Sequence, residues 1–113
     1  MARILSISYD ESLLETRRMM LEREGYEVHS AFGFAKAIDM CRSDEFDLII
    51  MGHSIPHEDK LQILSKLRKV CKAPVLALMR QGEQPLETAQ YVLDHWEPRH
   101  FLALVGRAIQ GED

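Results

Sequence analysis

The sequence lacks most of the features that mark specialised classes of protein. Its 113 residues include two cysteines, Cys41 and Cys71, which fit neither a disulfide framework nor a zinc-binding pattern. No apolar run approaches the ~20 residues that span a bilayer, and no apolar signal-peptide core is present. The net charge of −4 does not suggest nucleic-acid binding. We expect one cytoplasmic domain, residues 1–113, that contacts neither membrane nor nucleic acid and keeps both thiols reduced.

Short apolar segments alternate with amphipathic ones along the chain. Strands followed by helices build βαβ units, a parallel sheet and right-handed crossovers. The polar segment 80–90 contains Gly82 and Pro85, so it supports at most a short helix after Pro85. Asp10 or Ser12 is expected to cap the first helix, and Gly25 to end it. The predicted strands are 3–8, 26–31, 47–51, 73–79 and 91–93, and the later predicted helices are 34–43, 61–70 and 98–110.

Several phrases resemble the receiver domain of two-component response regulators. "GYEV" (25–28) is similar to the end of the first helix and the second strand of that family. "DLIIMGHSIPHED" (47–59) is similar to its third strand and following loop, and "APVLAL" (73–78) to its fourth strand. The resemblance covers about residues 3–110. It implies an α/β, flavodoxin-like, doubly wound sheet of five parallel strands in the order 2-1-3-4-5, with the fourth helix shortened or missing.

The positions that carry receiver chemistry differ in this sequence. The acidic pair at the end of the first strand is replaced by Ser8 and Tyr9, and the phosphoacceptor aspartate by Gly52. Met79 replaces the hydroxyl residue after the fourth strand, and Asp94 replaces the lysine after the fifth. Glycine has no carboxylate to accept a phosphoryl group, and Mg²⁺ would find too few carboxylate oxygens. The sequence therefore predicts a pseudo-receiver that is not an enzyme and holds no cofactor or metal.

Such a domain is expected to act in phosphorelay-type signal transduction by protein–protein interaction, without aspartyl phosphorylation. Its partner is a signalling protein or a second copy in a homodimer, and the expected partner face comprises Tyr91, Trp96 and Phe101. An open alternative is that Trp96 fills the space left by the shortened helix. We also expect the side chain of Tyr9 or Met79 to occupy the space beside Gly52.

Two other functions remain open at this point. One is a small-ligand or metal-binding domain that reuses the C-terminal edge of the sheet, and the other is a dimerisation module. The first depends on loop histidines, which are usually solvated and match no defined zinc spacing here. The residues expected near that edge are His53, His57 and His95, with the carboxylates of Asp10, Glu58 and Asp94.

Overall fold

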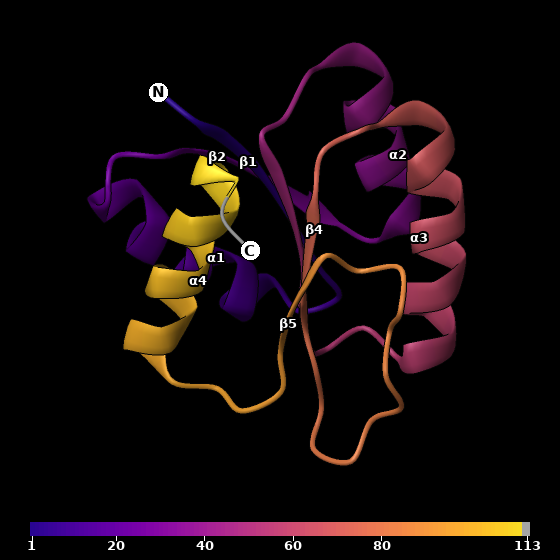
Figure 1. Ribbon diagram of the computed structural model, residues 1–113. Helices are drawn as coiled ribbons and strands as arrows, with labels where there is room; N and C mark the ends of the chain where they lie inside the picture. The colour runs from indigo at the N-terminus through magenta and orange to yellow at the C-terminus, as the bar shows by residue number, and fades with distance from the viewer. Residues whose placement is uncertain (112–113) are drawn as a thin grey trace.

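A computed structural model describes residues 1–111 as five parallel strands and four helices (Figure 1). The strand order is β2-β1-β3-β4-β5, which confirms the predicted fold class and order. The strands are β1 (Arg3–Ser8), β2 (Glu27–Phe32), β3 (Leu48–Met51), β4 (Val75–Leu78) and β5 (Tyr91–Leu93). The helices are α1 (Glu11–Arg23), α2 (Phe34–Ser43), α3 (His57–Val70) and α4 (Pro98–Gln110).

Helices cover both faces of the sheet: α1 and α4 lie on one face, and α2 and α3 on the other (Figure 1). Successive side chains of β3 point to opposite faces, so Leu48 and Ile50 pack under α1 and α4 while Ile49 and Met51 pack under α2 and α3. All four are buried, as a continuously apolar strand predicts. Within residues 1–111, no helix is long and apolar enough to cross a membrane.

The helix ends follow local capping rules. Asp10, one of the two predicted caps, accepts a hydrogen bond from the backbone N of Leu13 at 3.1 Å. Helix α4 spans the predicted residues and ends at Gly111, whose φ of 76° is the left-handed conformation that glycine adopts easily. Helix α3 begins at His57, four residues before its predicted start. The prediction missed these residues because 57–60 are polar and show no apolar periodicity.

The chain between β4 and β5 forms no helix in the described residues, as the sequence predicts. A right-handed crossover between these strands lies on the face of α3, and Leu86 is buried there in the cluster under α2 and α3. Trp96 lies on the opposite face, with its ring centroid 5.0 Å from that of Phe101. Leu86, and not Trp96, therefore fills the space of the missing helix.

The structure corrects one residue of the expected partner face. Phe101 lies on the inward face of α4 and is fully buried, with an exposed fraction of 0%. The Trp96 ring lies against it and is 45% exposed. A partner can reach Trp96 directly, whereas Phe101 acts as its support. The amphipathic pattern of α4 already placed Phe101 on the inward stripe with Val105 and Ala108.

Candidate functional site

The carboxyl ends of β1 and β3 are joined by hydroxyl groups. Ser8 Oγ lies 2.7 Å from Ser54 Oγ, and Ser54 Oγ accepts a hydrogen bond from the backbone N of Tyr9 at 3.1 Å. Ser8 Oγ also accepts from the backbone N of Asp10 at 3.0 Å. The Ser8 side chain is fully buried. Through these hydrogen bonds, Ser8 and Ser54 hold the loop after β3 against the residues that precede α1.

Arg17 occupies the space beside Gly52. A Cβ atom on Gly52 would lie 3.1 and 3.3 Å from the two terminal nitrogens of Arg17 and 3.0 Å from the carbonyl oxygen of Ile7. Arg17 is 4% exposed, and its guanidinium donates to Ser6 Oγ at 3.0 Å. Burial lowers its pKa to about 10. Any side chain at position 52 would compete with this cation for the same volume.

The expectation that Tyr9 or Met79 fills this space is wrong. The Tyr9 hydroxyl donates to Asp59 Oδ2 at 3.0 Å. Burial is the larger cause of the raised pKa of Tyr9, and this hydrogen bond is the next. Met79 is buried in the cluster under α2 and α3. Gly52 follows the side-chain direction of Ile50, which faces α1, so the nearest long side chain belongs to that helix.

A second buried cation lies on the other face of the sheet. Lys60, in the first turn of α3, is fully buried and donates at 2.8 Å to both Glu83 Oε1 and the carbonyl oxygen of Leu78. Glu83 also accepts from the backbone N of Arg80 and lies 2.9 Å from His57 Nδ1. Burial alone would raise the pKa of Glu83, but these hydrogen bonds outweigh it and lower that pKa.

Neither buried cation was among the candidates from the sequence, although a signal was present. Arg17 lies three residues after Leu14 and four before Leu21, inside the buried stripe of α1. Lys60 lies three residues before Ile63 and four before Leu64, at the start of the buried stripe of α3. A cation inside an apolar stripe indicates a buried charge, and a buried charge needs a counterion, a ligand or a dense set of hydrogen bonds.

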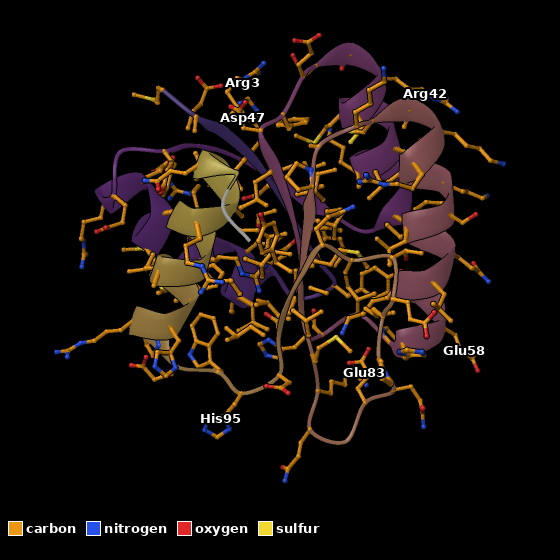
Figure 2. The ribbon with its side chains drawn as sticks, viewed as in Figure 1. Arg3, Arg42, Asp47, Glu58, Glu83 and His95 are labelled. Atoms are coloured by element: carbon orange, nitrogen blue, oxygen red, sulfur yellow. The ribbon has the colours of Figure 1, made fainter. Side chains whose placement is uncertain are left out.

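The three loop histidines are not brought together. His57 contacts Glu83 on the face of α3, whereas His53 and His95 line a cavity on the face of α1. Figure 2 shows Glu83 and His95 at the same end of the molecule, with Glu83 next to α3. Burial, then the charge of Arg17 and other cations, lowers the pKa of His53. In the part of the chain that the structure describes, no group of three or more His, Cys, Asp or Glu could hold a metal ion.

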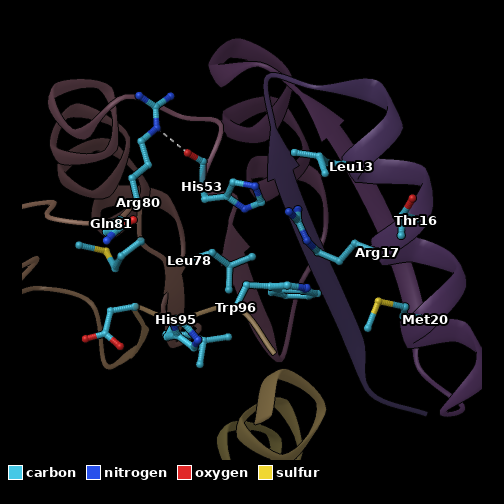
Figure 3. A pocket seen from close by; sticks show the side chains of 13 residues that line it. Leu13, Thr16, Arg17, Met20, His53, Leu78, Arg80, Gln81, His95 and Trp96 are labelled. Atoms are coloured by element: carbon cyan, nitrogen blue, oxygen red, sulfur yellow. Dashed lines mark hydrogen bonds between the residues drawn. The ribbon is translucent and has the colours of Figure 1, made fainter. Parts of the chain in front are cut away.

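The cavity that His53 and His95 line has a volume of about 680 Å³ (Figure 3). Helix α1 forms one wall, the end of β4 forms the floor, and the segment after β5 forms the other wall. Figure 3 shows Arg17 and Trp96 extending into this space from opposite walls, near His53. Asp94 also lines the cavity and is exposed. Of the five positions that the sequence analysis matched to receiver chemistry, Met79 and Asp94 border this space.

Comparison with known proteins identifies the family. The model of the response regulator receiver domain matches residues 4–95, so the chain belongs to that family. It is 27% identical over 81 residues to the transcriptional regulatory protein SrrA of Staphylococcus aureus, a match that covers 72% of this chain and 34% of that protein. The chain thus spans about a third of the curated relative that it matches.

Solved structures show the same fold. A response regulator receiver domain protein from Clostridium thermocellum superposes with a TM-score of 0.83 at 21% identity, covering 98% of this chain and 96% of that one. A CheY-like receiver domain protein from Methanospirillum hungatei gives a TM-score of 0.84 at 21% identity, covering 98% and 95%. Receiver domains are signalling modules of two-component systems that interact with proteins such as kinases and effectors.

Proposed function

We propose that this chain is a pseudo-receiver, a non-catalytic cytoplasmic module that signals by protein–protein contact without a phosphorylated aspartate. The observation that carries the proposal is the Arg17 guanidinium against Gly52. A phosphoryl-accepting receiver needs a carboxylate nucleophile at the end of β3, and this chain has a glycine there. The volume beside the glycine holds a buried cation.

The neighbouring positions support the same proposal. The Ser8 hydroxyl is engaged with Ser54, and the Tyr9 hydroxyl with Asp59. Met79 offers only a weakly accepting thioether, and Asp94 would repel a phosphoryl group. Mg²⁺ prefers carboxylate and water oxygens in octahedral geometry. Asp10, just after β1, supplies one carboxylate, which caps α1 by accepting from the backbone N of Leu13. The residues that follow β3, 52–56, supply none, and a single carboxylate makes a poor Mg²⁺ site.

The surface around β5 is the proposed contact face for a protein partner or a second copy. Val92 on this edge strand is 43% exposed, and Trp96 beyond it is 45% exposed. Tyr91 is half-buried at the start of the strand. Large apolar side chains of this kind anchor protein interfaces when a partner covers them. The missing helix leaves this face different in shape from that of a receiver with five helices.

A phosphorylation assay tests the proposal. The protein is incubated with acetyl phosphate and Mg²⁺, and its intact mass is measured alongside a receiver domain that has the phosphoacceptor aspartate. We expect a phosphoryl adduct on the control receiver and none on this chain, because Gly52 has no nucleophile. An adduct of one phosphoryl group that hydroxylamine removes, as it removes acyl phosphates, would overturn the proposal.

A further inference from the structure

The cavity beside α1 is of a size and composition that suit a small molecule. Ligand pockets commonly enclose roughly 300–1,000 Å³, and this one measures about 680 Å³. Its walls are mainly apolar, with Leu13 and Met20 from α1, Leu78 from β4, and Trp96 opposite them. Apolar walls with a few polar groups are typical of sites that bind organic ligands.

The charge in the cavity is predominantly positive. Arg17 and Arg80 line it, against the single carboxylate of Asp94 among the described lining residues. Arg80 is exposed, and its guanidinium donates to the carbonyl oxygens of His53 and Ser54. Arg17 is therefore the buried cation that faces the interior of the cavity (Figure 3).

Arg17 has no acidic partner among residues 1–111. Within residues 1–111, no carboxylate lies within ion-pair distance of its guanidinium, and its one hydrogen bond there goes to Ser6 Oγ. A guanidinium carries five N–H donors in a planar fork that matches the oxygens of a carboxylate or phosphate. Burying such a group without a counterion is costly, and an anionic ligand would remove that cost.

We propose that the cavity binds a small organic anion, whose carboxylate or phosphate group contacts the Arg17 guanidinium and whose apolar body packs against Leu13, Met20 and Trp96. The pKa of His53 is lowered first by burial and then by the positive charges of Arg17, Lys60 and Arg80. Glycine at position 52 leaves room for the Arg17 guanidinium, because a Cβ atom there would crowd its two terminal nitrogens. The inference goes beyond the proposed signalling role and does not require it.

Trp96 is the single tryptophan of the sequence, so its fluorescence reports on the cavity. The full chain is titrated with 3-phenylpropionate, phenyl phosphate and the uncharged 3-phenylpropan-1-ol. We expect a saturable change with at least one acid, and an affinity for the alcohol about tenfold or more lower, as loss of a charged hydrogen bond implies. The acid that binds with the higher affinity shows whether the site prefers a carboxylate or a phosphate group.

Matched arginine variants assign the binding to one side chain. Arg17→Met should weaken acid binding by about tenfold or more and leave alcohol binding unchanged. Arg17→Lys keeps a charge without the planar fork, so its affinity for the acids should lie between those of Arg17→Met and the unmodified chain. Arg18→Met is the control, because the neighbouring Arg18 pairs with Glu15 and Glu22 on the outer surface of the same helix. The control should bind the acids as the unmodified chain does.

Three results would overturn the inference: no saturable response to either acid at millimolar concentration, equal affinity for acid and alcohol, or unchanged acid binding by both Arg17 variants. Should Arg17→Met fail to fold, Arg17→Lys alone decides the last point. Phosphoryl transfer is read by mass and ligand binding by fluorescence, so the two proposals fail independently.

Discussion

Among the residues that the structure describes, each face of the sheet holds one buried cation, and the two cations differ in their partners. On the face of α3, Lys60 is paired with Glu83 at 2.8 Å and bonded to the carbonyl oxygen of Leu78. On the face of α1, Arg17 has a single hydroxyl, that of Ser6, as its hydrogen-bond partner within residues 1–111. Lys60 is neutralised inside the protein, whereas Arg17 faces a cavity.

The difference separates a structural charge from one that is available for binding. Glu83 belongs to the segment that replaces the fourth helix, so its bonds to Lys60 and His57 hold that segment against α3. A buried pair of this kind adds order where helical hydrogen bonds are missing. Arg17 adds no such order, and its retention in an apolar stripe is explained by a ligand that supplies the opposite charge.

The largest effect should come from removing the partner of Lys60. Glu83→Gln leaves a buried ammonium without its counterion, so we expect the free energy of unfolding in urea to fall by about 3–5 kcal/mol. Glu87→Gln, an exposed carboxylate of the same segment, is the matched control and should change it by less than about 0.5 kcal/mol. A loss of under about 1 kcal/mol for Glu83→Gln would mean that the pair does not hold the segment.

A smaller effect, of opposite sign, should follow when Arg17 is replaced. Arg17→Met removes a buried charge that has no acidic partner within residues 1–111, so the free energy of unfolding should rise by about 1 kcal/mol or more. Arg18→Met serves as the control, since exposed ion pairs contribute about 0–1 kcal/mol. Destabilisation by Arg17→Met would show that Arg17 is as structural as Lys60, and the contrast between the two faces would disappear.

The mildest perturbation is a change of pH, which acts on Glu83 without altering the sequence. The folded-state pKa of Glu83 lies below its ordinary value, so the stability it adds is present above about pH 4.5 and is lost as the pH falls through the folded pKa. Between about pH 5 and pH 3, Glu83→Gln should therefore lose less stability than the unmodified chain. Parallel slopes in urea titrations would contradict this assignment, and Glu87→Gln again provides the control.

The helices and strands follow from local pattern, and several were predicted to the residue. Helix α4 spans 98–110 because Pro98 favours the first turn and Gly111 takes a left-handed end. The continuously apolar β3 indicated a strand covered on both faces. The start of α3 was missed because its first four residues are polar. As a result, Lys60 was not recognised as a member of the buried stripe of that helix.

The candidate site was predictable only in part. The position of Gly52 directly after β3 was predicted correctly, because the apolar run that forms β3 ends there. The presence of Arg17 beside Gly52 was not predicted, since it depends on which helix crosses the sheet near the end of β3. Phe101 was assigned to a surface although the stripe of α4 buries it. The three histidines were grouped by their loops, but the two faces of the sheet separate His57 from His53 and His95.

By itself, the sequence determined the order of the elements, the parallel sheet, a fourth helix that is shortened or missing, and a residue without a side chain at position 52. These follow from periodicity, turn residues and side-chain identity, which are local properties of the chain. The tertiary structure alone decided that Lys60 meets Glu83, 23 residues away, and that Arg17 meets Gly52 and a cavity instead of an acid. A buried charge takes its role from the groups that folding brings within a few ångströms, because Coulomb energy falls with distance and rises as water is excluded.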